Sequence, residues 1–178
     1  MKITLITATL NSSRTITDCL DSVNSQTYPD VDQIIIDGQS TDDTLGIIRS
    51  TPNRVSGIVS EPDSGLYDAM NKGISMATGD VIGILNSDDL YIDDHVLQEV
   101  ADLMTKTGAD SLYADLFYVR ANNTEKIQRY WQTKEFVPGS FAKGWHPPHP
   151  TFFVRKEIYE KYGLFDTTLK VSADFELM

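Results

Sequence analysis

The chain of 178 residues is long enough for one domain in which helices cover both faces of a central sheet. Its 26 acidic and 15 basic residues give a formal net charge of -11, the opposite of the usual balance in duplex-binding proteins, so nucleic acid is not an expected partner. Cys19 is the single cysteine, which excludes a disulfide within the chain and favours a reducing compartment.

No apolar run approaches the roughly 18 residues of a membrane span. Met1 and Lys2 lead directly into a strand-like segment, where a secreted protein would have a signal peptide. We therefore expect a cytoplasmic protein. Peripheral contact with a membrane stays open, because docking needs only a basic or amphipathic patch.

Strand-like and helical segments alternate through the first part of the chain. The expected strands are apolar and rich in β-branched residues, and they cover residues 2–8, 31–36, 54–60 and 80–85. The segments between and after them carry apolar residues at helical spacing: Ile16, Cys19, Leu20 and Val23; Leu45 and Ile48; Leu66, Met70, Gly73, Ile74 and Ala77; Val96, Leu97, Val100, Leu103 and Met104. This alternation predicts a mostly parallel sheet with right-handed crossovers.

The second part of the chain is less regular. Residues 109–119 are expected to continue the sheet, and the pattern becomes irregular from residue 120 onward. A strand at 151–154, a helix near 156–162 and the start of a helix at 173–178 follow. Because the sequence stops in that last helix without a C-cap, we expect a fragment of a longer protein.

A locally basic, aromatic stretch lies between residues 120 and 150. It holds five basic residues against two acidic ones, with five aromatic residues that include Trp145. In an acidic chain this balance indicates a surface for an anionic ligand or anionic lipid head groups. The alternative is an ordinary loop-rich surface.

Two adjacent carboxylates, Asp88 and Asp89, follow directly on the expected strand at 80–85. Like charges side by side are costly unless a cation lies between them, and ligands usually bind at the carboxyl edge of an open α/β sheet. The chain has no glycine-rich dinucleotide motif or phosphate loop, so phosphate would need a metal and a few basic or amide donors. The pair is therefore a candidate site for Mg²⁺ or Mn²⁺. The alternative is a turn that caps the next helix.

Further polar residues sit where they would reach the same edge. Asp37 ends the second strand, so it either accepts a hydrogen bond from a base or ribose, or begins a plain turn before Gly38. The polar segment at 60–73 leads into an otherwise apolar helix, and its acids and lysine either contact a ligand or cap and solvate that helix. His149 follows two prolines and is a candidate contact for phosphate or acceptor. Asp174 and Glu176 diverge on a helix, so one alone would serve as a general base.

Taken together, these segments resemble the family-2 glycosyltransferases of the GT-A fold, and the resemblance runs from Ile3 to Met178. The segments that carry it are residues 6–11 (Ile-Thr-Ala-Thr-Leu-Asn), 26–29 (Gln-Thr-Tyr-Pro), 37–42 (Asp-Gly-Gln-Ser-Thr-Asp), 61–74 (Glu-Pro-Asp-Ser-Gly-Leu-Tyr-Asp-Ala-Met-Asn-Lys-Gly-Ile), 86–89 (Asn-Ser-Asp-Asp) and 173–177 (Ala-Asp-Phe-Glu-Leu). The segment at 61–74 is similar to bacterial polysaccharide-building members. The resemblance implies an α/β fold with one domain over 1–178, divided into a nucleotide-sugar-binding half (1–118) and an incomplete acceptor-side half (119–178).

The resemblance also implies roles for individual residues. Asp174 takes the place of the catalytic base, while Asp88 and Asp89 take that of the metal pair. The expected nucleotide contacts are Thr7, Thr9, Asn11, Asp37, Asp63, Asn71 and Lys72. The expected contacts on the acceptor or phosphate side are His149, Trp145 and Glu176. Two departures stand out, because Asn86 replaces the first aspartate of the usual metal motif and Gly38 replaces a frequent second aspartate.

The implied activity is an inverting, Mg²⁺- or Mn²⁺-dependent transfer of a sugar from a nucleotide-diphosphate sugar, which we expect to be a UDP-sugar. The acceptor would be a hydroxyl of a glycan or of a lipid-linked molecule in bacterial polysaccharide biosynthesis. Two alternatives remain. One is a nucleotide-sugar-binding module without activity. The other is a nucleotidyltransferase, for which Asn11-Ser12-Ser13-Arg14 is a poor version of the required glycine- and Arg/Lys-rich loop.

Overall fold

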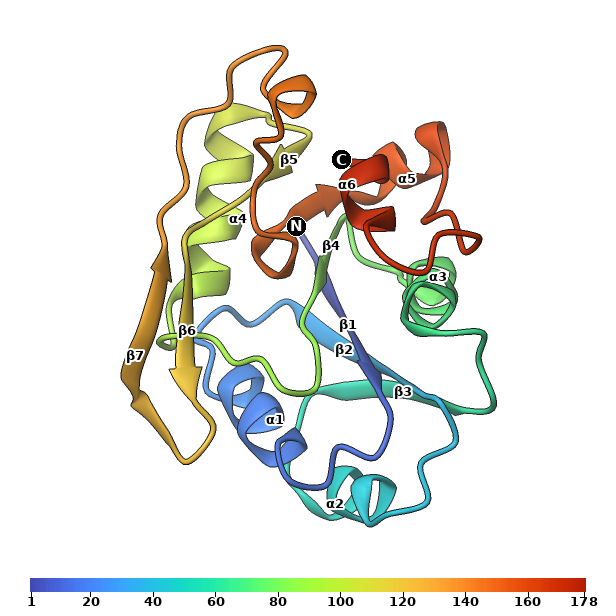
Figure 1. The fold of residues 1–178 in the computed structure, drawn as a ribbon. Helices are drawn as coiled ribbons and strands as arrows, with labels where there is room; N and C mark the ends of the chain where they lie inside the picture. The colour runs from blue at the N-terminus through green and yellow to red at the C-terminus, as the bar shows by residue number, and fades with distance from the viewer.

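A central sheet separates two layers of helices in the computed structural model, which describes all 178 residues (Figure 1). Its six strands run in the order β3-β2-β1-β4-β8-β5. The bounds are β1 (Ile3–Thr9), β2 (Val31–Asp37), β3 (Val55–Ser60), β4 (Val81–Ile84), β5 (Ser111–Leu112) and β8 (Phe153–Arg155). β1 to β4 pair in parallel, whereas β8 is antiparallel to both of its neighbours. The predicted mostly parallel sheet is confirmed, and β8 brings a segment from the expected acceptor-side half into it.

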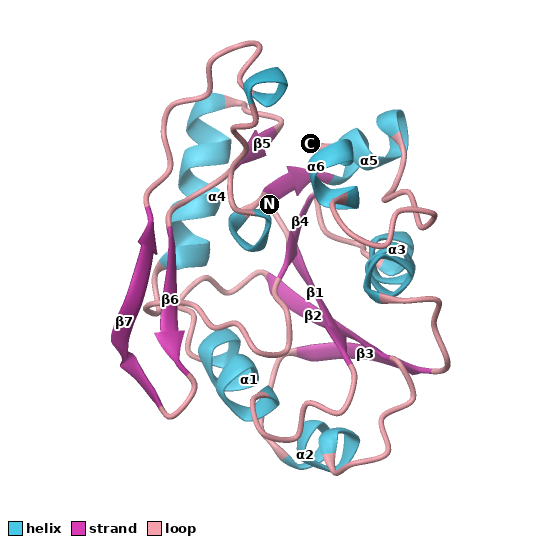
Figure 2. Cartoon of the chain, in the orientation of Figure 1, coloured by secondary structure: helices cyan, strands magenta, loops and turns pink.

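Helices cover both faces of the sheet (Figure 2). One face packs against α1 (Ile16–Asn24), α2 (Thr44–Ser50) and α4 (Val96–Thr107) through a buried apolar cluster. The other packs against α3 (Leu66–Met76), α5 (Lys156–Tyr162) and α6 (Ala173–Leu177). Strand side chains alternate between the two clusters, so Ile3 and Leu5 of β1 face one layer while Ile6 and Ala8 face the other. The chain also has two short 3-10 turns, η1 (Phe141–Lys143) and η2 (His149–Thr151), both before β8.

The segment expected to continue the sheet does so only at β5. Residues that follow instead form a separate two-stranded hairpin, β6 (Leu116–Arg120) and β7 (Asn123–Trp131), at the left of Figure 1. The expectation of irregular structure from residue 120 onward was therefore wrong for β7. Because β7 is exposed at every position except its last, it has no apolar face to reveal the strand in the sequence.

α3 lies unusually close to the sheet. A Cβ on Gly73 would come within 2.3 Å of Ile6 Cγ2, so the missing side chain lets the helix backbone approach β1. Because α3 follows the parallel strand β3, its amino end lies at the carboxyl edge of the sheet, where the candidate site lies. No helix in the structure is both long and apolar enough to cross a membrane.

Candidate functional site

Hydrogen bonds join the loops that follow β1, β2 and β4 at the carboxyl edge of the sheet. The hydroxyls of Ser12 and Ser87 are 2.8 Å apart, which links the first loop to the third. Asn11 has a φ of 52° and donates its backbone N–H to Ser40 Oγ over 2.8 Å, while its Oδ1 accepts from the N–H of Thr41 at 2.9 Å. Asn11 is therefore a loop-positioning residue, and its amide oxygen is already engaged.

The predicted metal pair lies in the loop after β4. Asp88 is exposed, and Asp89 is partly buried. Asn86 donates from Nδ2 to Asp89 Oδ2 over 3.0 Å, and its own Oδ1 is buried without a partner. Burial raises the pKa of Asp89 despite the hydrogen bond from Asn86, and the charge of Asp88 raises it further.

These oxygens fit a hard divalent cation. Two carboxylates and the unpartnered Oδ1 of Asn86 are the ligand types that Mg²⁺ and Mn²⁺ prefer. No cluster of three His, Cys, Asp or Glu side chains exists in the structure, so the protein alone offers an incomplete ligand set. A cation held here would complete its coordination with phosphate oxygens or water, as Mg²⁺ commonly does. An amide at position 86 both donates to Asp89 and keeps an oxygen free, which an ionised aspartate could not do.

Asp37 differs from its expected role. Its side chain is fully buried, and its two oxygens accept three hydrogen bonds. Oδ2 accepts from the N–H of Ser40 (3.0 Å) and the hydroxyl of Ser60 (2.7 Å), and Oδ1 accepts from Ser40 Oγ (2.5 Å). These bonds tie the loop after β2 to the end of β3. The structure therefore gives Asp37 a scaffolding role beneath the sheet edge, and contact with a base stays a prediction.

The two threonines of β1 that were expected to contact the nucleotide, Thr7 and Thr9, also differ from each other. Thr7 is fully buried and accepts a hydrogen bond from Gln33 Nε2 at 2.9 Å. The Thr7 hydroxyl is therefore enclosed within the protein, and its contact with a nucleotide base stays a prediction. Thr9 lies at the end of the same strand, only 5% exposed, and its hydroxyl has no partner. A buried polar group without a partner is rare, so Thr9 Oγ1 remains a candidate ligand contact.

The polar segment before α3 divides into structural and candidate site residues. Asn71 clamps the backbone of Phe165, donating to its carbonyl at 2.9 Å and accepting from its N–H at 3.0 Å. Both amide atoms of Asn71 are thus used within the protein, and its nucleotide contact stays a prediction. Lys72 pairs with Glu61 (2.9 Å) and Asp68 (3.5 Å), so its charge is compensated within the protein, which weakens the case for its expected nucleotide contact.

Asp63 points toward the loop after β2. Its Oδ1 accepts from the N–H of Gly65 at 2.9 Å, and its Oδ2 lies 2.6 Å from where a Cβ on Gly38 would stand. The Asp63 carboxylate therefore fills the space that a side chain at position 38 would take. It gives this edge an acidic group where Gly38 supplies none.

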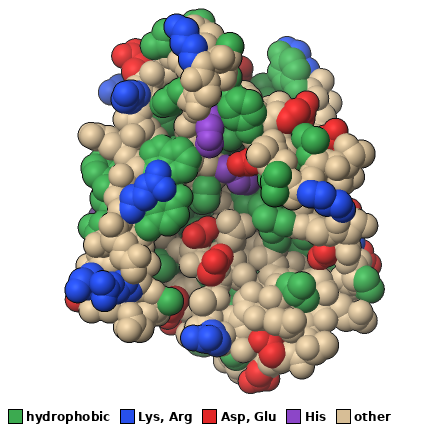
Figure 3. Space-filling model, viewed as in Figure 1, with side chains coloured by type: hydrophobic (Ala, Val, Ile, Leu, Met, Phe, Trp, Pro, Cys, Tyr) green, Lys and Arg blue, Asp and Glu red, His purple; other side chains and the backbone are tan.

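Asp174 lies in the first turn of α6. Its Oδ1 accepts a hydrogen bond from the Tyr67 hydroxyl at 2.9 Å. His149 is near enough for the charge of Asp174 to act on it, although burial is the stronger effect and lowers the pKa of His149. η2, which begins at His149, packs against β4, the strand that leads to Asp88 and Asp89. Figure 3 shows histidine and acidic side chains gathered around a hollow in the middle of this face.

The second half of the chain contributes a cluster of aromatic rings next to α6. Trp145 meets Phe141 edge-on at 6.2 Å between ring centroids, and Phe141 lies 5.5 Å from Phe175 of α6. Trp145 therefore belongs to an aromatic wall that reaches the helix of Asp174. Glu176 is exposed and its side chain makes no hydrogen bond, so the structure assigns it no role.

Comparisons with known proteins concern the family and the fold of this chain. Residues 4–163 match the family described as glycosyl transferase family 2. A PGL/p-HBAD biosynthesis glycosyltransferase of Mycobacterium bovis is 29% identical over 176 residues, which cover 97% of this chain and 66% of that protein. An uncharacterized glycosyltransferase of Mycobacterium tuberculosis is 26% identical, over 99% of this chain and 67% of its own length. The chain thus spans about two thirds of the length of these relatives.

Solved structures share the fold. The crystal structure of S. aureus TarS 1-349 in complex with UDP has a TM-score of 0.75 at 24% identity, covering 99% of this chain and 54% of TarS 1-349. The mannosyltransferase PcManGT from Pyrobaculum calidifontis, in complex with GDP-Man and Mn2+, has a TM-score of 0.72 at 23% identity and covers 97% and 49%. The fold of this chain is therefore the GT-A fold that the sequence resemblance implied.

Proposed function

We propose a sugar-transfer reaction for this chain, which belongs to glycosyl transferase family 2. The donor is a nucleoside-diphosphate sugar, and the acceptor is a hydroxyl group of a glycan or lipid-linked molecule. The observation that carries the proposal is that the candidate site has both an adjacent pair of carboxylates and a separate single carboxylate. Asp88 and Asp89 follow β4 as a pair, while Asp174 stands alone with one oxygen free of hydrogen bonds.

The mechanism we propose is a single displacement with inversion. The acceptor hydroxyl attacks the anomeric carbon from the face opposite the diphosphate. The new C–O bond forms as the bond to the diphosphate oxygen breaks, and the electron pair leaves on the diphosphate. Asp174 accepts the hydroxyl proton on Oδ2, since Oδ1 is occupied by Tyr67. A base positioned in this way accelerates a reaction about 10²- to 10⁴-fold.

Asp88 and Asp89 would hold Mg²⁺ or Mn²⁺, with Asn86 Oδ1 as a third oxygen donor. When bound, such an ion neutralises charge that develops on the leaving diphosphate. Support for the metal also comes from PcManGT, which shares the fold and was solved with GDP-Man and Mn2+.

The test of the base is Asp174→Asn. Because the acceptor is unknown, the assay is the release of nucleoside diphosphate from UDP-GlcNAc and GDP-mannose with water as acceptor. We expect turnover to fall by about 10²-fold or more, while calorimetry shows unchanged binding of UDP or GDP. Glu157→Gln, which changes an exposed acid on α5, is the control and should keep full turnover. Turnover by Asp174→Asn at the rate of the unaltered protein would remove the base role.

The test of the metal pair uses calorimetry of nucleoside diphosphates with Mn²⁺ or EDTA. Asp88→Ala and Asp89→Ala should each abolish the difference between the two conditions, and exposed Asp94→Ala should keep it. An affinity that is equal with Mn²⁺ and with EDTA in the unaltered protein would count against the site.

The same assays separate the alternative functions. A nucleotide-sugar-binding module would bind the donor without releasing nucleoside diphosphate. A nucleotidyltransferase would release pyrophosphate from a nucleoside triphosphate and a sugar phosphate. We propose the transferase over both. A binding module has no need for a carboxylate with a free oxygen such as Asp174, and residues 11–14 are a poor version of the loop that a nucleotidyltransferase requires.

Nucleoside recognition at the edge near Gly38 is proposed to fall on Asp63 and Thr9. Asp63 is partly exposed and engages only one backbone N–H, whereas Asp37 is buried beneath three donors. Thr9 contributes a hydroxyl without a protein partner. A carboxylate and a hydroxyl here suit the N–H of a base and the hydroxyls of a ribose.

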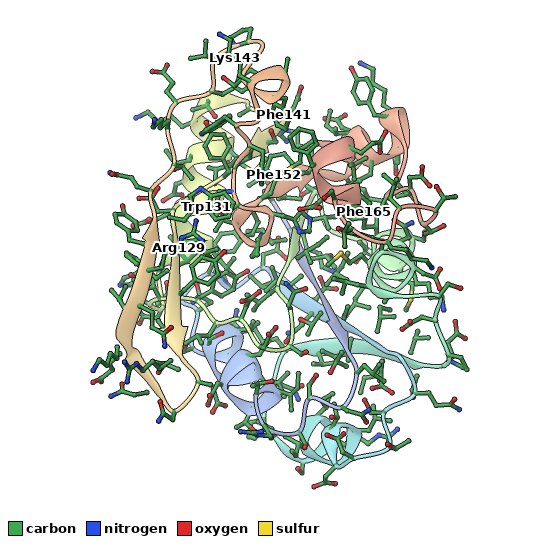
Figure 4. The ribbon with its side chains drawn as sticks, viewed as in Figure 1. Arg129, Trp131, Phe141, Lys143, Phe152 and Phe165 are labelled. Carbon is green, nitrogen blue, oxygen red and sulfur yellow. The ribbon has the colours of Figure 1, made fainter.

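We further propose that the β6–β7 hairpin contacts anionic lipid, as a lipid-linked acceptor would require. The hairpin contacts the rest of the fold only sparsely, and Tyr118 (42%), Ile127 (53%) and Tyr130 (47%) are exposed on it. The Arg129 guanidinium lies 5.2 Å from the Tyr118 ring centroid and 5.7 Å from that of Trp131 (Figure 4). Basic and aromatic side chains together are typical of surfaces at membrane interfaces.

Vesicles of phosphatidylcholine with and without phosphatidylglycerol test this contact. Each basic residue near an anionic surface contributes about 1 kcal/mol. Neutralising Lys126, Arg129 and Lys134 together should therefore abolish sedimentation with the anionic vesicles. Arg49→Gln on α2 is the control, because it removes an exposed charge far from the hairpin (Figure 1). Unchanged sedimentation of the triple variant would overturn the proposal.

A further inference from the structure

The Tyr67 hydroxyl is the one side-chain donor to the Asp174 carboxylate. It lies in the first turn of α3, and Asp174 lies 107 residues later in the first turn of α6. The bond to Oδ1 measures 2.9 Å, and Oδ2 accepts none. The two oxygens of one carboxylate are thus distinguished by a single tyrosine.

Tyr67 is itself held rigidly. Its ring stacks on Phe165 with 5.4 Å between centroids and 26° between planes. The backbone of Phe165 is in turn clamped on both sides by Asn71, one turn further along α3. Figure 4 shows Phe165 between α3 and α6. The ring and the amide from one helix therefore hold the segment that leads to α6.

Asp174 has few other restraints. α6 has only five residues, too short to be stable without tertiary contacts. It begins after Ser172, a non-glycine residue at a φ of 67°, and Ala173 is its one fully buried residue. The helix is also held by Phe175, whose ring lies 5.5 Å from the rings of both Phe141 and His146, whereas the bond from Tyr67 acts on the Asp174 side chain itself.

We infer that Tyr67 is a positioning residue for the catalytic base: its hydroxyl holds Oδ1 of Asp174 so that Oδ2 faces the acceptor hydroxyl. This inference rests on the proposed role of Asp174. Geometry at the attacking atom strongly affects rate, because a displaced base loses the aligned approach that makes proton transfer efficient. Burial, reinforced by the bond to Asp174, raises the pKa of Tyr67, so the hydroxyl keeps its proton and remains a donor at neutral pH.

Tyr67→Phe tests the inference, because it removes the hydroxyl and keeps the ring that stacks on Phe165. The assay is release of nucleoside diphosphate from UDP-GlcNAc and GDP-mannose. We expect kcat to fall about 10- to 100-fold, the loss that corresponds to one hydrogen bond to a charged group, with the donor KM within twofold. Tyr159→Phe is the control, since the residue is buried on α5 and its hydroxyl has no hydrogen-bond partner in the protein, and its kcat should not change.

The outcomes separate the inference from the proposed function. Unchanged kcat in Tyr67→Phe, with Asp174→Asn inactive, overturns the inference and leaves the base role intact. Full turnover by Asp174→Asn overturns the base role, and the inference falls with it. A rise in KM at constant kcat also overturns the inference, because it indicates a binding role.

A spectroscopic measurement does not depend on activity. The ultraviolet titration of Tyr67, identified as the difference between the unaltered protein and Tyr67→Phe, should move to lower pH in Asp174→Asn. The variant removes a negative charge that opposes ionisation of the phenol. A titration that does not move would show that the two side chains are not in contact, and would overturn the inference.

Discussion

Asp37→Ala should damage the fold while leaving the nucleotide contacts in place. The buried carboxylate accepts three hydrogen bonds, from the N–H and hydroxyl of Ser40 and the hydroxyl of Ser60. A hydrogen bond to a charged group contributes about 1.5–3 kcal/mol, and bonds in one network do not add fully. We therefore expect a loss of about 3–5 kcal/mol in the free energy of unfolding. For a chain of this size that lowers Tm by about 6–20 °C.

Asp63→Ala is the matched comparison. Its side chain accepts one hydrogen bond from a backbone N–H, so its loss should cost about 1 kcal/mol and a few degrees in Tm. Nucleoside diphosphate affinity, measured by calorimetry below the lower Tm, should fall in Asp63→Ala and persist in Asp37→Ala. The reverse pattern, with a stable Asp37→Ala that no longer binds nucleotide, would refute the scaffolding role and restore Asp37 as a base contact.

Three further predictions concern the core and the site. Gly73→Ala should lower the free energy of unfolding in urea by about 1–2 kcal/mol, because overpacking against Ile6 outweighs the gain in helix propensity; increased stability would mean that α3 moves freely. Burial raises the pKa of the Cys19 thiol to about 12, so it should not react with a disulfide reagent at pH 8 until urea unfolds the chain; rapid labelling of the native protein would contradict this. Burial also lowers the pKa of His149, so the unfolded chain binds a proton near its ordinary pKa while the folded chain does not. Stability should therefore fall as pH drops below about 6.5, and His149→Gln should flatten that slope in Tm measured against pH.

The layered core could be predicted from the sequence because its hydrophobic pattern is strong. The four helical stripes in the first part of the chain coincide with α1, α2, α3 and α4, and the apolar runs coincide with β1 to β4. β1, β2 and β4 are buried along most of their length, and such parallel strands appear as continuous apolar runs, which leave little ambiguity; β3, at the sheet edge, is partly exposed. The final helix pair was found for the same reason.

The β6–β7 hairpin and the position of β8 in the sheet could not be predicted from the sequence. β7 carries polar residues on both faces, so its alternate positions do not form an apolar face that would mark it as a strand in the sequence. β8 enters the sheet antiparallel between β4 and β5, and such pairing depends on contacts between residues far apart in the chain. Local pattern contains no information about that order.

Residue type and chain order together located the candidate site, but roles within it depended on contacts. Asp37 and Asp63 are both acids at the sheet edge, and only the three serine donors around Asp37 distinguish the buried scaffold from the accessible group. Asn71 resembled a ligand contact until Phe165 was found between its two amide atoms. Tyr67 carried no signal of its own, because it meets Asp174 from 107 residues away.

The sequence by itself determined the class of the molecule: an acidic α/β domain with a carboxylate pair at the end of its fourth strand. That information is local, since burial and periodicity are properties of short segments. Only the tertiary structure decided which side chains make their hydrogen bonds within the protein and which keep a polar atom without a partner, as Asn86, Thr9 and Asp174 do. The physical reason is that each polar atom makes few bonds, and its partners are brought to it by the fold.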